Sequence, residues 1–255
     1  FKRVSKIVVA NNDCYGILGS QSTPNGGSTG GQYGPDELYL LFNRIHDGRT
    51  GVWFGSNNGS YGRTYMIGNL FYNMSQPEGF DRDVSGHDGV AYGGGGGGTR
   101  YFLNNTIYNT DGGIALWTDN FTGPLVVKNN IFSNMQNGAH FFSIDGPPSS
   151  TSSNIFDGPG LFHFTNHTYD LVQFESTYMS TTYDNQAASP QFVSAAGLDF
   201  HLQSTSPAID TASPLPPEVF TNFQNSFGAP FPQVDIDGNP RPANAWDVGA
   251  FEAQP

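Results

Sequence analysis

The sequence predicts an all-β fold, a parallel β-helix in which short strands stack from coil to coil, and three observations lead to this prediction. The first is a motif of an asparagine followed by an apolar pair, which occurs five times, at Asn43, Asn69, Asn105, Asn130 and Asn154. Successive copies lie 26, 36, 25 and 24 residues apart. Repetition at this period is typical of solenoids, in which each unit buries its apolar face against the next.

The second observation is a series of glycines, each of which opens an alternating apolar stretch after the asparagine motif. Two examples are 51–54 (GVWF) and 113–116 (GIAL). We therefore expect each coil to contain a strand, a tight turn, a second strand and a loop of variable length. Equivalent strands of successive coils would pair in parallel at a spacing of roughly 4.8 Å.

The third observation is the composition. The chain of 255 residues contains 33 glycines and 17 prolines, whereas charged residues make up only 13%. This balance is typical of turn-rich β proteins and argues against helical bundles. The single cysteine, Cys14, cannot form an internal disulfide. No apolar run approaches the roughly 18 residues of a membrane-spanning helix, so we expect no membrane insertion.

Alternation along the strands assigns side chains to the two faces of each sheet. One inward stack of apolar side chains is expected from Ile45, Phe71, Ile107, Phe132 and Phe156. The five motif asparagines lie two residues earlier, on the same face. Stacked asparagine amides can bond from coil to coil and satisfy buried turn amides, so this ladder is interpreted as structural.

The repeat fades after residue 165, so the coils are assigned to residues 1–165. Residues 166–255 are expected to form the last coil and an irregular C-terminal cap of the same domain. An open solenoid end needs a polar and irregular cover of this kind. Within the tail, residues 235–239 (DIDGN) look like a calcium loop, but the twelfth-position glutamate of an EF-hand is missing. A structural turn is the favoured interpretation.

The net charge of −12 is unevenly distributed. Residues 129–255 hold twelve acidic residues against Arg241 alone. A nucleic-acid partner is not expected, because phosphate backbones bind basic surfaces. The N-terminal half is close to neutral and is compatible with an anionic sugar polymer.

The asparagine repeats, together with 199–210 (DFHLQSTSPAID) and the closing segments DIDGNPRP and WDVGAFE, resemble the C-terminal portion of secreted bacterial right-handed parallel β-helix proteins of the pectate-lyase-like superfamily. The resemblance covers essentially the whole chain, and it implies a right-handed β-helix that is extracellular or at the cell surface. Members include polysaccharide lyases, glycosidases and surface proteins. Their usual N-terminal capping helix is not expected here, because residues 1–9 have the pattern of a coil strand, which would permit end-to-end self-association.

Outward positions of the first strand form a column of His46, Tyr72 and Tyr108, which Trp53 on the second strand extends. Aromatic side chains at coil spacing would make an exposed platform, and sugar rings stack on such platforms through their C–H faces. These four residues are the predicted substrate-binding set. The alternative is simple cross-strand packing on the outside of the helix.

Lyase chemistry on uronic acids needs a group that neutralises the carboxylate, a base and a proton donor. The predicted catalytic residues are Arg82 and His87, in the inserted segment 75–88, together with Arg100. If a metal neutralises the substrate, Ca²⁺ is the expected cofactor, bound by the acidic residues of the same segment, Asp81, Asp83 and Asp88. The alternative is a solvated loop whose charges pair locally.

Hydrolysis by paired carboxylates would have to use Asp47 with the same three loop acids, and it ranks below lyase chemistry because no Asp-Asp pair supports it.

Lys128 departs from the repeat pattern. It occupies the motif position of Leu41, Ile67 and Leu103, which are expected to point inward, and a slip of register is the favoured explanation.

The predicted function is therefore an extracellular protein that interacts with polysaccharide, with lyase activity on acidic glycans as the leading enzymatic version. A glycoside hydrolase is less favoured. The alternative is a non-catalytic structural or adhesive solenoid, a subunit of an extracellular fibre whose open coil ends pair with one another.

Overall fold

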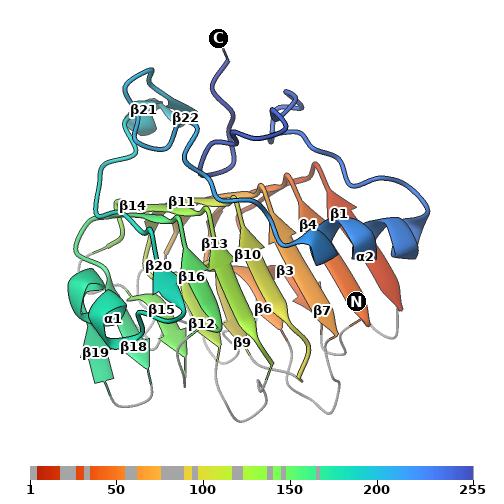
Figure 1. Ribbon diagram of the computed structural model, residues 1–255, viewed down its shortest axis with the longest axis horizontal. Coiled ribbons are helices and arrows are strands. Elements are labelled where there is room, and N and C mark those ends of the chain that lie inside the picture. The colour runs from red at the N-terminus through yellow and green to blue at the C-terminus, as the bar shows by residue number, and fades with distance from the viewer. Residues whose placement is uncertain are drawn as a thin grey trace.

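The computed structural model describes residues 5–17, 27–31, 35–54, 62–75, 89–93, 97–116, 123–136, 140–144, 148–164 and 167–254. Most of its strands lie in three long sheets (Figure 1). The first sheet contains, in spatial order, β1 (Lys6–Ala10), β4 (Glu37–Leu41), β7 (Arg63–Ile67), β10 (Arg100–Leu103), β13 (Leu125–Lys128), β16 (Ser150–Ser152) and β20 (Thr182–Tyr183).

The second sheet contains β2 (Asp13–Tyr15), β5 (Arg44–Gly48), β8 (Leu70–Met74), β11 (Thr106–Thr110), β14 (Ile131–Ser133) and β17 (Ile155–Asp157). The third contains β3 (Gly27–Gly31), β6 (Thr50–Phe54), β9 (Ala91–Gly93), β12 (Ile114–Leu116), β15 (His140–Ile144), β18 (Leu161–Phe164) and β19 (His167–Tyr169). All described pairings in these sheets are parallel except the one between β18 and β19.

The chain visits the three sheets in a fixed order, and from β1 to β15 each strand pairs with the strand three positions later. The predicted all-β class is confirmed, and the parallel stacking is compatible with a β-helix. Each coil has three strands, not the two expected from the sequence. The repeat pattern predicts the asparagine motif as part of one strand, but it spans a two-residue corner between two strands. In one such corner, β4 ends at Leu41 and β5 begins at Arg44.

The corner between the first and second sheets explains the repeated asparagines. Its first residue has a positive φ in every described coil: Asn11, Phe42, Gly68, Asn104, Asn129, Ser153 and Asp184. Its second residue is an inward asparagine whose Oδ1 accepts hydrogen bonds from the asparagine of the preceding coil, as between Asn69 and Asn105 (2.9 Å from Nδ2, 3.0 Å from N). The predicted structural ladder is confirmed, and it also includes Asn12 and Asn185.

The interior between the sheets is filled by the predicted apolar stack. Ile45, Phe71, Ile107, Phe132 and Phe156 are all buried in one cluster. The rings of Phe132 and Phe156 are stacked, with centroids 5.1 Å apart. Burial of this continuous stack supplies the main stabilising term, because no coil could hide its apolar side chains by itself.

The C-terminal end of the stack is closed by a short segment that includes α1 (Leu171–Thr177). Asp170 and Gln173 form a capping box at its start, which satisfies backbone amides of the first turn. On the inner side of the helix, Phe174 is fully buried, and its ring stacks on Phe162 of β18 at 4.3 Å. This helix therefore seals the interior cluster.

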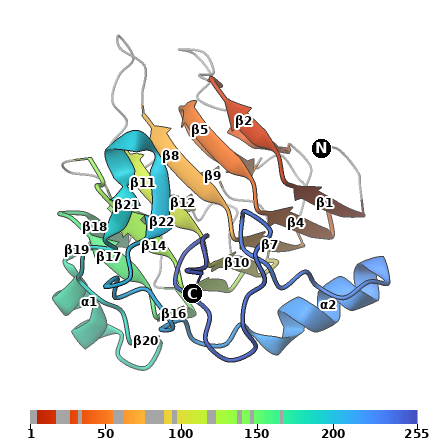
Figure 2. The ribbon, with the colours of Figure 1, turned by 90° about the horizontal axis from the view of Figure 1, so that it is seen from above.

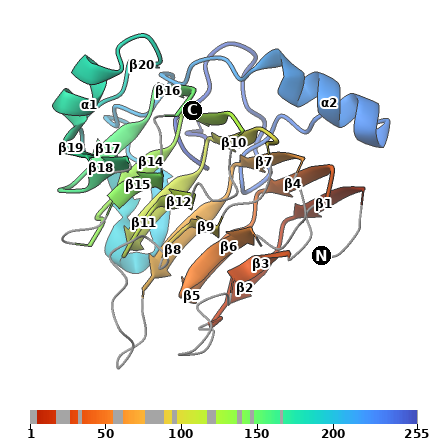
Figure 3. The ribbon, with the colours of Figure 1, turned by 90° about the horizontal axis from the view of Figure 1, so that it is seen from below.

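Most of the tail does not cap the end. Residues 187–254, here named the cover, run back along the outside of the first and second sheets (Figures 1 and 2). The cover contains β21 (Phe192–Ser194), β22 (Asp199–Leu202) and α2 (Pro217–Phe227). Figure 3 shows the third sheet on the side away from it. Residues 166–255 are expected from the sequence to form the last coil and a cap; β20 continues the first sheet, but residues 187–254 cover the side of the sheets and not their end.

The cover is required because the outer face of the first sheet is apolar. Tyr39, Tyr65 and Tyr101 stack on that face, with ring centroids 4.2 and 4.7 Å apart. From α2, Phe223 packs edge-on against Tyr39 (5.1 Å), and the Asn222 amide donates to the Tyr65 hydroxyl (2.7 Å). Without α2 this aromatic surface would face water.

Lys128 also belongs to this outer face. It pairs with Leu103 in an unbroken register, so the predicted slip is wrong. The predicted inward direction of its column is also wrong, because Leu41, Ile67 and Leu103 pack in the cluster formed with the cover. Lys128 is half-buried in the same column, between Leu103 and Ser152, where a long side chain can keep its ammonium group in water. Among the described residues, no helix is long and apolar enough to cross a membrane.

Candidate functional site

The predicted aromatic column exists but is not an open platform. His46 stacks on Tyr72 at 4.4 Å and Tyr15 stacks on His46 at 5.4 Å. However, Tyr72 is only 8% exposed, and Phe200 of the cover packs against both Tyr72 (5.5 Å) and Tyr108 (5.1 Å). The prediction of an exposed sugar platform is therefore wrong at Tyr72 and Tyr108, because alternation shows which face a ring is on but not what covers that face.

The imidazole of His46 is held between two carboxylates, at 2.7 Å from Asp47 and 2.9 Å from Asp13. The other carboxylate oxygen of Asp47 accepts from Asn73 (3.0 Å), so this aspartate is already engaged within the surface column. Trp53 lies in β6, and the described part of the structure does not include its side chain.

Arg100 is not available for catalysis. It is fully buried at the start of β10, and its Nη1 donates to the carbonyl oxygens of Gly62 (2.7 Å) and Gly98 (2.9 Å). The guanidinium thus ties the loop ends of neighbouring coils together, and the predicted catalytic role is corrected to a structural one. The other predicted catalytic and metal-binding residues lie outside the described residues: Arg82, His87, Asp81, Asp83 and Asp88.

The calcium-like motif forms the turn that the sequence suggested. Asp235 Oδ1 accepts from the backbone amides of Asp237 (2.9 Å) and Asn239 (2.8 Å). Its Oδ2 accepts from the amide of Glu252 (3.0 Å), so both oxygens are used within the protein. Among the described residues, no group of three or more metal-binding side chains comes together.

The closing motifs form a buried charge network that holds the cover together. Arg241 Nη1 donates to the Glu252 carboxylate (2.7 Å), and Nη2 donates to the carbonyl of Gly249 (2.8 Å). Asp247 accepts from the amides of Asp210 (2.8 Å) and Ala253 (2.6 Å). Burial raises the pKa of Asp247 above its usual range and raises the pKa of Glu252 to about 7.

The Glu252 pKa predicts a specific pH dependence. In the folded protein this carboxyl stays protonated to about pH 7, whereas its ordinary pKa is 4.5. The contribution of the neutral Glu252 carboxyl to the free energy of unfolding is therefore fully present below pH 4.5 and is lost as the pH rises through 7. The free energy of unfolding falls by about 3 kcal/mol over this range. We expect Glu252→Gln, which stays neutral, to lose this dependence in urea unfolding between pH 4 and 8. Exposed Glu218→Gln is the control, and an unchanged slope in Glu252→Gln would contradict the assignment.

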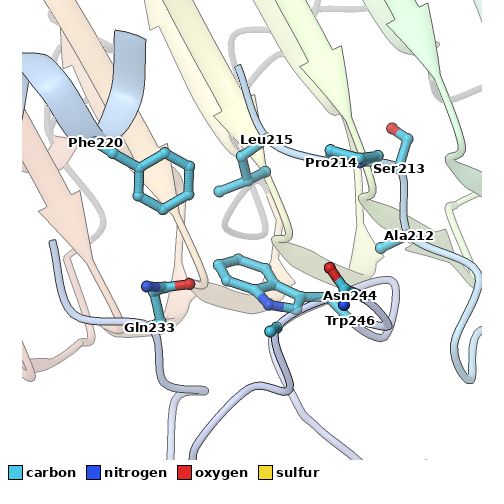
Figure 4. Close-up of a pocket in the computed structure, with 9 residues that line it drawn as sticks. Ala212, Ser213, Pro214, Leu215, Phe220, Gln233, Asn244 and Trp246 are labelled. Atoms are coloured by element: carbon cyan, nitrogen blue, oxygen red, sulfur yellow. The ribbon is translucent and has the colours of Figure 1, made fainter. Parts of the chain in front are cut away.

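A cavity of about 240 Å³ lies within the cover (Figure 4). Its lining comes from residues 212–215 before α2, from α2 itself, from residue 233 and from residues 243–246. The lining residues are Ala212, Ser213, Pro214, Leu215, Phe220, Gln233, Ala243, Asn244 and Trp246. Trp246 lies opposite Leu215 and Phe220 across the cavity in Figure 4. Its walls are therefore an indole and a phenyl ring, with exposed amides from Gln233 and Asn244 at the rim.

The position of Trp246 follows from the buried network. The guanidinium of Arg241 lies over the indole, 5.1 Å from the ring centroid, in cation–π geometry. The backbone carbonyl of Trp246 accepts from the amide of Ala212 (3.0 Å). Both contacts hold the ring in place before any ligand arrives, which reduces the entropy lost on binding.

The cavity can bind but has no means of acid–base catalysis. None of its lining residues carries a group that titrates near neutral pH. Aromatic faces combined with amide and hydroxyl groups are suited to a ligand that has both C–H surfaces and hydroxyls, such as a sugar ring. No sequence pattern indicates this site, because no spacing connects Phe220 and Gln233 with Trp246.

A larger cleft of about 760 Å³ is also lined in part by the 239–247 segment, and its lining residues include His201, Asp210, Arg241, Asp247 and Glu252. His201 bonds to Asp199 (2.6 Å) and Asp237 (2.9 Å). Burial alone would lower the pKa of His201, but these two carboxylates outweigh it and raise the pKa. Because His201 is paired with Asp199 and Asp237, and Arg241 with Glu252, this cleft is a weaker candidate than the Trp246 cavity.

Comparison of the chain with protein-family models, with curated proteins and with solved structures finds no match.

Proposed function

We propose that this protein is an extracellular polysaccharide-interacting protein that recognises sugar residues through the Trp246 cavity. The observation that carries the proposal is the composition of that cavity: a half-buried indole faces a phenyl ring, and exposed amides stand at its rim. Sugar rings bind between such apolar faces while their hydroxyls bond to the amides.

The proposal includes a right-handed parallel β-helix of the pectate-lyase-like superfamily as the scaffold. The fixed order of three parallel sheets and the seven-member asparagine ladder support the coil architecture. The resemblance of the closing motifs supports secretion. On this scaffold the cover lies outside the coils, so a glycan chain can reach the cavity without entering the solenoid.

Recognition and turnover are assigned to different places. The Trp246 cavity lacks an acid or base, so binding there leaves the sugar intact. A lyase centre on Arg82 and His87, with or without Ca²⁺, remains a proposal. If this proposal is correct, the protein releases unsaturated uronates from alginate, pectin or a glycosaminoglycan, and their ultraviolet absorbance measures the release.

The binding proposal is tested by Trp246→Ala. Loss of the indole removes one wall of the cavity, so we expect binding to the best polysaccharide of a soluble panel to weaken at least tenfold, or about 1.4 kcal/mol. Affinity electrophoresis or calorimetry measures the change. Tyr15→Ala is the matched control, because it removes a 65% exposed aromatic ring that does not line the cavity.

Two further results complete the test. Trp246→Phe keeps an aromatic wall and should retain part of the affinity. Unchanged binding by Trp246→Ala, with native circular dichroism, would show that the cavity is not the site. Absence of binding by the wild-type protein to every polysaccharide would reject the function itself.

The second candidate function is a non-catalytic structural or adhesive solenoid. The observation in its favour is that Val172 and Met179, at the end of the stack closed by α1, are 77% and 74% exposed. Apolar side chains in water favour association with another surface. Filaments in electron micrographs, together with no polysaccharide binding, would favour this function over the proposed one.

A further inference from the structure

We infer that the Trp246 cavity selects an uncharged sugar residue and discriminates against uronates. This inference rests on the proposed function and specifies the chemical class of its ligand. It differs from the acidic-glycan substrate expected from the sequence. The inference is based on the side chains that line the cavity and on the charges around it.

The cavity offers no cation to a carboxylate. Its lining contains apolar, hydroxyl and amide side chains only. The nearest guanidinium, Arg241, lies against Trp246, but it is buried and its donors serve the protein. Nη1 binds Glu252 and the carbonyl of Asp247, and Nη2 binds the carbonyl of Gly249. A uronate that stacked on the indole would lose water without gaining a partner, which is costly for a charged group.

The surrounding charge is also unfavourable for an anion. Within residues 129–255 Arg241 is the only Lys or Arg, against twelve acidic residues, and Lys128, which precedes the Asn129 bonded to Ser213, lies just outside this range. One of these acidic residues, Glu218, is exposed on α2, where its carboxylate accepts a hydrogen bond from the Tyr101 hydroxyl (3.2 Å). This net negative charge disfavours the approach of a carboxylate, and physiological salt screens the effect over about 8 Å.

An uncharged sugar satisfies the same groups without this penalty. The amides of Gln233 and Asn244 each offer a donor and an acceptor, which match hydroxyls that do both. Among the described contacts, neither amide side chain bonds to another residue, so both remain available at the rim. The hydroxyl of Ser213 donates to Asn129 (3.1 Å) and keeps its acceptor capacity.

The test compares polymers that differ only in their carboxylates. Homogalacturonan and alginate are each used in native form and after carboxyl reduction, which converts uronates into neutral hexoses. We expect the Trp246-dependent part of the affinity, taken as wild type against Trp246→Ala, to be at least tenfold greater for the reduced form. The preference should shrink at high salt, where the surrounding charges are screened.

A variant that introduces a positive charge gives a second readout. Asn244→Lys places an ammonium group at the exposed rim and should shift the preference toward the native, carboxylated polymers. Asn244→Gln is its control, because it keeps the amide and should keep the neutral preference. Since Asn244 is exposed, neither change is expected to disturb folding.

The outcomes separate this inference from the proposed function. Equal or tighter binding of the native polymers, abolished by Trp246→Ala, would overturn the selectivity and leave sugar recognition intact. Failure of either form of any polymer to bind would overturn both.

Discussion

Asn105→Ala is expected to destabilise the protein by about 3 to 5 kcal/mol, because it leaves several buried polar groups without partners. Asn105 Oδ1 accepts from the backbone amide and the side chain of Asn69 (3.0 and 2.9 Å). Its Nδ2 donates to the carbonyl of Met66 and to Asn130, both at 2.9 Å. The residue lies in the middle of the ladder, where water cannot replace these bonds.

The matched control for this prediction is Asn12→Ala at the N-terminal end of the ladder. Asn12 donates to Asn43 (2.9 Å) and to the carbonyl of Ala10 (3.0 Å), but it is exposed. Water can take over these bonds, so we expect a loss of less than about 1 kcal/mol. Urea unfolding followed by circular dichroism compares the two variants, and equal losses would show that the ladder does not act through burial.

Arg241→Met is expected to have a comparably large effect, about 3 to 5 kcal/mol, localised to the cover. It removes the single cation from a buried group of three carboxylates, those of Asp235, Asp247 and Glu252. Above about pH 7, where Glu252 is also ionised, the three carboxylates would then repel one another without compensation. We expect faster cleavage of residues 187–254 by chymotrypsin, and also weaker polysaccharide binding, because Arg241 supports Trp246.

Two variants make this result interpretable. Arg44→Met removes another arginine that contacts the cover, through Asp237 at 2.5 Å, but this pair is on the surface and should contribute less than about 1 kcal/mol. The double variant of Arg241→Met with Glu252→Gln should recover part of the loss, since one of the unpaired carboxyls is gone. No recovery, or equal effects of the two arginine variants, would contradict the role assigned to Arg241.

The repeating part of the fold was predictable because its information is local. The ladder position of Asn105 and the interior position of Phe132 follow from a pattern that each coil repeats, and every copy supports the same assignment. The three-strand coil was not predictable from that pattern. Its corner residues, such as Phe42 with a φ of 56°, carry the sequence of a strand but the backbone of a turn.

The position of the cover could not be predicted, because its contacts join distant residues only once. The side chain of Asn104 donates to the carbonyl of Asp247 (2.8 Å), and that of Asn129 donates to the carbonyl of Ser213 (2.8 Å). At Gly249, which has a φ of 97°, a Cβ atom would stand 2.7 Å from Ile131 Cδ1 and Thr106 Oγ1. Only glycine permits this approach to the second sheet.

The same contacts explain why the candidate site differed from the expected one. Alternation placed Tyr72 and Tyr108 on an outer face, but whether that face binds sugar depends on what lies over it, and Phe200 does. The Trp246 cavity appears only when α2 and the closing segment are brought together over the first sheet.

The sequence by itself determined the all-β class, the parallel stacking and the asparagine ladder, because a periodic pattern encodes contacts between equivalent residues of neighbouring coils. Only the tertiary structure decided that the tail covers the outer sheets, that Arg100 is buried and that Trp246 faces Phe220. These features depend on single contacts between segments far apart in the chain, which no repetition along the sequence records.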